Sequence, residues 1–328
     1  MLCGSFFGIV FSVAIADAQD APSSTPEVQE PLKVQSDLVF LQVSVEDEHD
    51  VFRDDLKSSQ FRIFDDGAER NLAFFESVDT PAHIAVLIET SPAVYLIQNQ
   101  HIAAAYSLLD GLAPDDQIAL ATYDKSARVA LDFTTDRSAV IRALDGMQYF
   151  LGMGDLNFYD AVNSSLAWLR ASSGKKALVV LATGLDSSAE SRWNALQTEL
   201  EKTDVSVFTV ALGGAVRNFK SKKAVQGPQA SFQRADTALR EIAKITGGQS
   251  YFPVTPDDFV KAYREISAQL RHQYLLAYLP PPHDGRVHSI EVQVMNAQGR
   301  VVGATKGANG STNGFRVFSR QSYLSPEK

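Results

Sequence analysis

Three apolar runs in the sequence are each followed at once by residues that could contribute to a ligand site. Apolar runs such as 83–88 and 176–182 are typical of strands buried on both faces of a parallel sheet. Ligands of open α/β sheets bind beyond the carboxyl ends of such strands. We therefore predict a ligand site where the residues after these runs meet. The runs and the residues after them are 83–88 with Glu89 and Ser91, 176–182 with Thr183, and 205–212 with Gly213.

Amphipathic segments alternate with the apolar runs between residues 80 and 272. After the first run, for example, Val94, Ile97, Ala104 and Leu108 recur at helical spacing. Strand and helix in alternation predict an α/β domain with a doubly wound, mostly parallel sheet.

The flanking segments, 32–79 and 273–328, contain short apolar stretches separated by polar turns. One turn, Asp65-Asp66-Gly67, has a composition that favours a β-hairpin. Neither flank alone offers enough strands to bury two sheet faces. We therefore predict that the two flanks pair into a single β-sandwich module.

The N-terminus, residues 1–18, has the pattern of a secretory signal peptide. Residues 6–16 are apolar but too few to span a bilayer, and a small-x-small cleavage site ends at Ala18. Residues 19–31 have the composition of a linker. We predict an exported protein, periplasmic or secreted, that is cleaved near Ala18; a buried first helix is the alternative. Cleavage would also remove Cys3, the one cysteine, so the mature chain would suit an oxidising compartment.

Composition and charge exclude several classes of protein. The chain has 45% apolar and 21% charged residues, as expected for a globular protein. Its net charge of -9 argues against nucleic acid as a partner, because phosphate binding needs a surplus of Lys and Arg. No segment of the mature chain is long and apolar enough to span a membrane. The sequence also lacks the HExxH, CxxC, GxSxG and GxxxxGK[ST] motifs of common enzymes.

Three segments of the α/β region resemble the loops of a von Willebrand factor type A (VWFA) domain. They are 85–93 (AVLIETSPA), 154–162 (GDLNFYDAV) and 179–186 (VVLATGLD). In that family these loops supply Asp-x-Ser-x-Ser, Thr and Asp, which hold one Mg²⁺ or Mn²⁺, and an acidic group of the partner protein completes the coordination. The resemblance implies a von Willebrand A-like fold that binds a protein through the top face of its sheet.

The flanks carry a resemblance of their own. Segments 61–76, 273–279 and 315–324 are similar to the secreted VWFA-related proteins abundant in acidobacteria. The resemblance therefore extends over nearly all of residues 32–325.

The family's metal ligands are only partly present. Ser91 is retained, but Glu89 stands in place of Asp and Ala93 in place of the second Ser. Leu156 falls at the Thr position and Thr183 at the third-loop Asp position. Because Mg²⁺ requires near-ideal octahedral oxygen geometry, these changes predict a degenerate site that needs no cofactor.

A second interpretation remains open for the same residues. Glu89, Ser91 and Thr183 could form a rearranged site for Mg²⁺ or Mn²⁺, joined by Asp155 or Asp186. In the first interpretation, these side chains only end strands and cap helices.

Segment 213–233 is predicted to be a long loop at the binding face. Its basic residues could act as an electrostatic latch for an acidic partner, or the loop could be a solvated insertion. Together with polar residues of the other loops, they form the candidate set for partner binding: Ser91, Asp155, Asp186, Arg217, Lys220, Lys222 and Lys223.

The sequence therefore predicts an exported, non-enzymatic module for adhesion or scaffolding, whose protein partner is not identified. The alternative from another class is a cofactor-free hydrolase that uses the carboxylates of Glu89, Asp155 and Asp186. That alternative requires paired carboxylates close enough to share acid and base roles.

Overall fold

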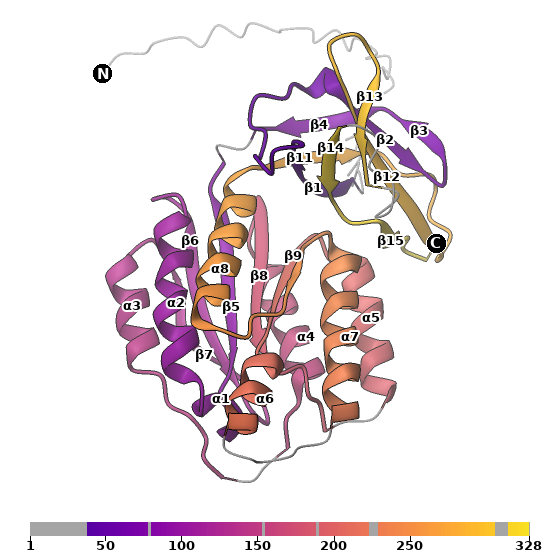
Figure 1. Ribbon diagram of the computed structural model, residues 1–328. Coiled ribbons are helices and arrows are strands. Elements are labelled where there is room, and N and C mark those ends of the chain that lie inside the picture. Colours follow the sequence, from indigo (N-terminus) through magenta and orange to yellow (C-terminus); the bar gives the residue numbers. More distant parts are fainter. Residues whose placement is uncertain are drawn as a thin grey trace, which may run out of the picture. The chain divides into compact units, whose positions relative to one another are not determined.

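Two β-sheets organise the protein in the computed structural model (Figure 1). The structure describes residues 38–77, 80–152, 155–187, 190–222, 229–305 and 314–327. All of them belong to one unit, residues 37–328. The predicted signal peptide and linker lie outside the described residues. No helix in the described ranges is long and apolar enough to cross a membrane.

The α/β domain is built on a six-stranded sheet with the order β10-β9-β8-β5-β6-β7. Every neighbouring pair is parallel except β6 and β7, which form an antiparallel hairpin. All eight residues of β8 are buried, the first two being Lys175 and Lys176, and this burial explains the apolar run over 177–182. The strands are β5 (Ala82–Glu89), β6 (Gln117–Tyr123), β7 (Ala127–Thr134), β8 (Lys175–Ala182), β9 (Ser206–Ala211) and β10 (Ser250–Tyr251).

Helices cover both faces of this sheet, so the domain is doubly wound, as predicted (Figure 1). One face packs against α1 (Pro92–Tyr95), α2 (Gln98–Gly111), α3 (Arg137–Asp145), α6 (Gly213–Lys222) and α8 (Pro256–Arg271). The other packs against α4 (Phe158–Leu169), α5 (Glu190–Lys202) and α7 (Gln229–Thr246).

The prediction of a long loop over 213–233 is wrong. Helix α6 begins directly after β9, and α7 begins at Gln229. Ala215 and Val216 are buried in the core of the sheet, and Phe232 is buried near the start of α7. The burial of these apolar side chains favours helix over a solvated loop, although several basic residues lie in the same segment.

The second sheet unites the two ends of the chain. Strand β1 pairs with β11 and β14, and β2 pairs with β12, which confirms the predicted pairing of the flanks. A short 3₁₀ helix, Ser58–Gln60, precedes β2. The strands are β1 (Val39–Glu46), β2 (Phe61–Asp65), β3 (Ala68–Arg70), β4 (Leu72–Glu76), β11 (Gln273–Tyr278), β12 (Val287–Met295), β13 (Val301–Ala304), β14 (Phe315–Phe318) and β15 (Ser322–Leu324).

These nine strands fold over on themselves around one core, and we call this unit the β module. The ring of Phe61 in β2 lies 5.2 Å from the ring of Tyr274 in β11. The hydroxyl of Tyr278 in β11 donates to Asp65 in β2 at 2.9 Å. Because β2 and β11 are not neighbours in the sheet order, these contacts connect two opposed layers.

Buried polar side chains join the β module to the α/β domain. The Gln42 amide donates to the carbonyls of Lys176 and Asp204 at 2.8 and 2.7 Å. The Arg320 guanidinium donates to the carbonyls of Thr203 and Glu201, and burial lowers its pKa to about 10. These bonds satisfy backbone groups at the edge of the α/β domain that burial would otherwise leave unpaired.

Candidate functional site: the top face of the α/β domain

The top face comprises the carboxyl ends of the parallel strands and the loops that follow them. Glu89 is the last residue of β5 and pairs with Tyr123 at the end of β6. On its other side, β5 pairs with β8, and Thr183 follows the last residue of β8. The parallel register therefore brings Glu89 and Thr183 together, as the sequence predicted.

The Glu89 carboxylate is completely buried and accepts four hydrogen bonds. Ser91 Oγ donates to Oε1 at 2.6 Å. Three groups donate to Oε2: the Thr183 amide at 2.6 Å, Thr183 Oγ1 at 2.8 Å and the Tyr123 hydroxyl at 3.0 Å. Because each carboxylate oxygen has two lone pairs, protein donors saturate Oε2, whereas Oε1 accepts from Ser91 alone among the described residues.

Burial raises the pKa of Glu89, and the hydrogen bonds from Ser91, Thr183 and Tyr123 act in the opposite direction. Ser91 also caps α1, because its Oγ accepts from the Val94 amide at 3.4 Å. The carboxylate and its donors thus join the ends of β5, β6 and β8 to the start of α1.

Two other positions of the family's metal loops carry no side-chain oxygen. Ala93 lies in α1 and is half-buried. Leu156 is also half-buried, and its amide donates to Ser187 Oγ at 3.0 Å. Of the five positions that supply metal ligands in the family, three therefore carry side-chain oxygens here. They are Glu89, Ser91 and Thr183, and hydrogen bonds bring their oxygens together.

The other predicted carboxylates are placed differently. Asp186 Oδ2 accepts from the Tyr159 amide at 2.9 Å, in the first turn of α4, and Asp155 is exposed. Among the described residues, one cluster of three acid or imidazole groups has its ligand atoms within 4.8 Å of one another, and it contains neither of these residues nor Glu89. The structure does not bring the three proposed hydrolase carboxylates together as such a cluster.

The basic residues of α6 are only partly described. The Arg217 guanidinium lies 3.5 Å from Asp236 Oδ2 and 4.8 Å from the centre of the Phe232 ring, so it connects α6 to α7. Lys220 and Lys222 lie on α6, and Lys223 lies outside the described residues.

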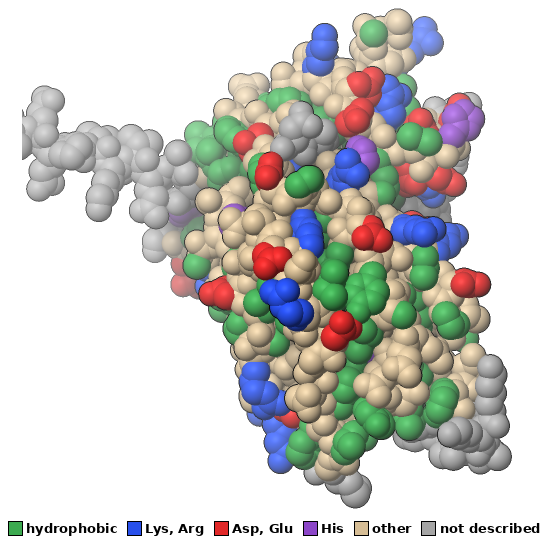
Figure 2. Space-filling view, turned by 90° about the vertical axis from the view of Figure 1, so that its left-hand side faces the viewer, with side chains coloured by type: hydrophobic (Ala, Val, Ile, Leu, Met, Phe, Trp, Pro, Cys, Tyr) green, Lys and Arg blue, Asp and Glu red, His purple; other side chains and the backbone are tan. Residues whose placement is uncertain are grey.

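Sequence reasoning missed an exposed apolar patch beside Glu89. Tyr95, Leu96, Phe150 and Leu151 are 42%, 40%, 41% and 62% exposed, and we call them the top patch. The Phe150 amide donates to the Thr90 carbonyl at 2.9 Å, which holds the two segments of the patch together. Figure 2 views the side on which α2 and α3 lie, and hydrophobic side chains gather on the lower part of that face. The signal in the sequence was the run 93–96, which is apolar throughout, although a short surface helix should have a polar side.

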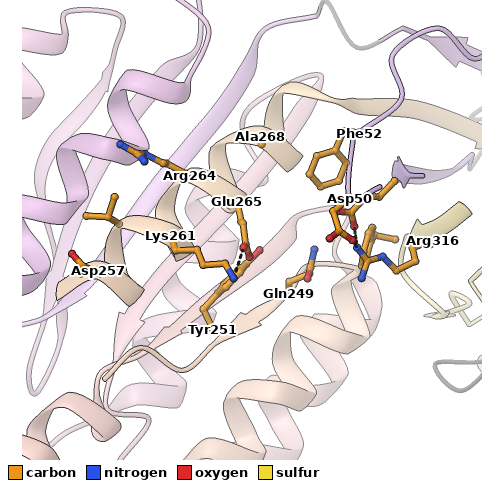
Figure 3. A pocket seen from close by; sticks show the side chains of 13 residues that line it. Asp50, Phe52, Gln249, Tyr251, Asp257, Lys261, Arg264, Glu265, Ala268 and Arg316 are labelled. Atoms are coloured by element: carbon orange, nitrogen blue, oxygen red, sulfur yellow. Dashed lines mark hydrogen bonds and ion pairs between the residues drawn. The ribbon is translucent and has the colours of Figure 1, made fainter. Parts of the chain in front are cut away.

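Two cavities lie away from the top patch. One of about 630 Å³ is lined by Asp186 and by aromatic residues Tyr159 and Trp193, and α7 forms its far side. The larger, about 810 Å³, lies where α8 meets the β module (Figure 3). There Arg316 lies 2.9 Å from Glu46, whose pKa is raised mainly by burial. Ion pairs between side chains of the protein occupy much of the polar lining of the larger cavity.

The chain was compared with protein families and with solved structures. A family model described as von Willebrand factor type A domain matches residues 83–262. Among solved structures, a von Willebrand factor type A protein from Catenulispora acidiphila is 11% identical with a TM-score of 0.45, over 83% of this chain and 74% of that chain. An aerotolerance-related membrane protein from Bacteroides fragilis is 13% identical with a TM-score of 0.43, over 58% of this chain and 98% of that chain. The PilB minor pilin from Streptococcus sanguinis is 10% identical with a TM-score of 0.43, over 58% of this chain and 61% of that chain.

No curated protein matches this chain. The doubly wound sheet flanked by a separate strand-rich sheet defines a von Willebrand A-type α/β fold. The family model covers more than half of the chain. The chain belongs to the von Willebrand factor type A domain family, as its sequence resemblance implied.

Proposed function

We propose that this protein is an exported, non-enzymatic binding module that captures a protein partner through the top patch. The observation that carries the proposal is the exposure of four large apolar side chains at the end of the sheet where ligands of this fold class bind. Aromatic and aliphatic side chains exposed together are typical of protein interfaces, because association removes their apolar surface from water.

Recognition in this proposal needs no bridging cation. A metal that links the domain to a partner carboxylate requires oxygen ligands with free lone pairs. Three protein donors saturate Oε2 of Glu89, and Ser91 donates to Oε1. Ala93 and Leu156 offer no side-chain oxygen, so these loops leave few free lone pairs for a metal. Among the candidate residues for partner binding, Asp155, Asp186, Arg217, Lys220, Lys222 and Lys223 would contribute to the polar rim of the interface, whereas Ser91 is 3% exposed and would act by holding Glu89 and α1 in place.

Site-specific photo-crosslinking tests this proposal. A benzophenone amino acid is placed at Leu151 in the patch, and at Val129 in β7 as the control, because the two side chains are similarly exposed at 62% and 56%. Both proteins are irradiated in cell-envelope extract of the source organism, with and without EDTA. We expect a discrete protein adduct at Leu151 alone, unaffected by EDTA and lost in the Tyr95→Asp, Phe150→Asp variant. Equal labelling at both positions, or none at Leu151, would contradict the proposal.

Export rests on the predicted signal peptide and is tested separately. N-terminal sequencing of the protein isolated from the periplasm or medium should begin at Gln19. Recovery of the intact N-terminus from the cytoplasm would refute this part of the proposal.

One observation favours a second candidate function, divalent-cation-dependent binding. The hydroxyls of Ser91 and Thr183 lie 2.6 and 2.8 Å from the Glu89 carboxylate, so three oxygen-bearing side chains converge. Thermal unfolding in EDTA and then in excess Mg²⁺ separates the two candidates. A cation bound to the native state must raise the unfolding temperature, whereas the metal-free module should shift by less than about 1 °C.

A further inference from the structure

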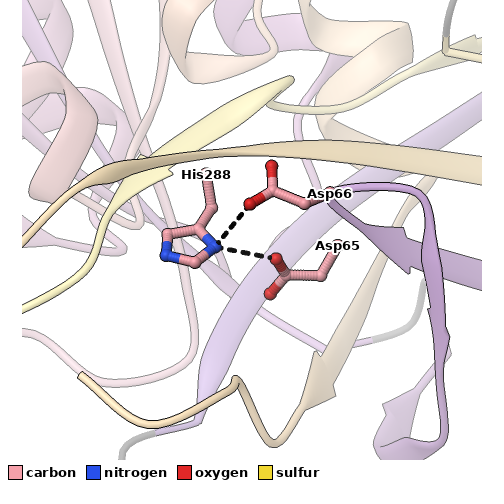
Figure 4. A group of neighbouring side chains, drawn as sticks. All are labelled: Asp65, Asp66 and His288. Atoms are coloured by element: carbon pink, nitrogen blue, oxygen red, sulfur yellow. Dashed lines mark hydrogen bonds and ion pairs between the residues drawn. The ribbon is translucent and has the colours of Figure 1, made fainter. Parts of the chain in front are cut away.

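A second cluster of charged side chains lies in the β module, away from the top face (Figure 4). It contains Asp65 at the end of β2, Asp66 in the turn that follows, and His288 in β12. The imidazole Nδ1 of His288 lies 3.1 Å from Asp65 Oδ1 and 3.0 Å from Asp66 Oδ2. Asp65 and His288 are buried at 0% and 5% exposure, so two of the three atoms lie out of water, and Asp66 closes the cluster from the solvent side.

Each of the two carboxylates is held by hydrogen bonds to its other oxygen. Asp65 Oδ2 accepts from the hydroxyls of Tyr278 and Tyr323 at 2.9 and 3.0 Å. Asp66 Oδ1 accepts from the amide and hydroxyl of Ser289 at 2.9 and 3.0 Å. The oxygens that face His288 are therefore fixed in position by donors that do not themselves enter the cluster.

The imidazole is oriented in the same way. His288 Nε2 lies 3.0 Å from Asp284 Oδ1, and Asp284 also pairs with Arg286 at 2.6 Å. Because an ionised carboxylate only accepts hydrogen bonds, Nε2 must carry a proton. In the doubly protonated ring, Nδ1 donates to the two carboxylate oxygens; in the neutral ring, it presents a lone pair, and the same three atoms are placed to hold a cation.

We propose that Asp65, Asp66 and His288 bind a divalent transition-metal cation, with Zn²⁺ as its representative. Ligands with bonds of about 2.1 Å to one ion are roughly 3.0 Å apart at right angles and roughly 3.4 Å apart at tetrahedral angles. The separations of Nδ1 from the two oxygens, 3.1 and 3.0 Å, match the first value, so a tetrahedral ion needs the exposed Asp66 side chain to move outward slightly. The imidazole favours Zn²⁺ over Mg²⁺ or Ca²⁺, which prefer ligand sets made only of oxygen. In zinc sites, the ring nitrogen of a metal-binding histidine that faces away from the metal commonly donates to a carboxylate, and Asp284 provides that carboxylate for His288.

A cation could reach this cluster from solvent and would stabilise the β module. The Asp66 side chain is 56% exposed, so water can complete the coordination on that side. Asp65 and His288 are 223 positions apart, on the N- and C-terminal flanks. Bound metal would therefore link the two ends of the chain within the β module and stabilise it against unfolding.

Direct Zn²⁺ binding tests this proposal. The full chain with Cys3→Ser, which removes the one thiol, is freed of metal with EDTA and titrated with Zn²⁺ against a chromophoric chelator. We expect one Zn²⁺ per chain and a rise in unfolding temperature of roughly 5 °C with saturating metal. Asp66→Asn and Asp284→Asn should each weaken binding by about 10- to 100-fold.

His49→Gln is the matched control, because His49 is an exposed histidine of the same module that lies beside Glu48. It should bind Zn²⁺ as tightly as the parent. His288→Gln should abolish Zn²⁺ binding. If that variant does not fold, Asp66→Asn still decides the question, because the Asp66 side chain is half-exposed. Equal Zn²⁺ affinity in the parent and in Asp66→Asn and Asp284→Asn would overturn the proposal and leave a protonated imidazole as the cation of the cluster.

Co²⁺ substitution gives an independent readout of the ligands. The parent protein should show visible d–d absorption, and X-ray absorption should detect imidazole nitrogen among the neighbours of the metal. A spectrum identical to that of aqueous Co²⁺ would count against the site, whatever the result at the top face.

Discussion

Thr183 holds Glu89 by two hydrogen bonds to a single oxygen, one from its amide at 2.6 Å and one from its hydroxyl at 2.8 Å. The two residues are 94 positions apart in sequence and meet because β5 and β8 are parallel neighbours. Thr183 takes the position where the family has an acidic residue, and it presents donors instead of a second carboxylate. The interaction thus joins two strand ends by hydrogen bonds between protein groups.

We predict that Glu89→Ala destabilises the protein by about 4 kcal/mol, because it leaves the donors of Ser91, Tyr123 and Thr183 buried without their acceptor. Urea unfolding measures the change. Glu48→Ala, an exposed acid in a turn, is the control and should lie within about 0.5 kcal/mol of the parent. A Glu89→Ala protein as stable as the parent would show that the carboxylate does not hold the strand ends together.

We predict that His101 makes the protein less stable in mild acid. His101 lies in α2 at 1% exposure, and burial lowers its pKa to about 4 from an ordinary value of 6.5. As the pH falls, the unfolded chain therefore binds the proton before the folded protein does. The stability that neutral His101 provides is complete above pH 6.5 and is lost as the pH falls toward 4.

The loss should reach about 3 kcal/mol once both states are protonated. Unfolding free energies of the parent and of His101→Leu, compared between neutral pH and mild acid, isolate this contribution. The difference between the two proteins should change with pH in that range; a constant difference would contradict the prediction.

We predict that Tyr263→Phe leaves stability unchanged or increases it by up to about 1 kcal/mol. Tyr263 is completely buried in α8, and its hydroxyl has no hydrogen-bond partner among the described residues. Tyr274→Phe is the matched control, because that hydroxyl donates to the Arg53 carbonyl and accepts from the Leu56 amide, both at 3.0 Å. Tyr274→Phe should be destabilising, and equal losses in both variants would imply an ordered water at Tyr263.

We predict that Gly247→Ala is much more destabilising than Gly174→Ala. Both glycines have left-handed backbones, with φ of +81° and +72°, so both substitutions share a strain of about 1 kcal/mol. A Cβ at Gly247 would collide with the backbone of Ser319 and Arg320, whereas nothing lies within 4 Å of a Cβ at Gly174.

The excess loss at Gly247 should exceed about 2 kcal/mol, because backbone at the junction with the β module would have to move. Differential scanning calorimetry of the two variants measures it. Equal unfolding temperatures would mean that α7 and the C-terminal flank are not in close contact.

The fold class could be predicted from the sequence because the patterns that indicate strands and helices are local. The apolar run 177–182 in β8 and the helical spacing of apolar residues in α2 both indicate burial through patterns visible among neighbouring residues. Pairing of the flanks followed from the shortage of strands in either one. Helix α6 was missed because Ala215 and Val216 become buried only when the sheet is assembled beneath them.

The apolar patterning of the sequence predicted a doubly wound α/β domain with Glu89, Ser91 and Thr183 at the carboxyl ends of its strands, and the resemblance of the loops implied the von Willebrand A-type fold. Only the tertiary structure decided how those side chains are used, since hydrogen-bond partners depend on distances that sequence spacing does not set. It also decided that His288, one of six histidines scattered through the chain, lies between Asp65 and Asp66. Residues 223 positions apart become neighbours through the pairing of β2 with β12, and no local pattern in either strand records that contact.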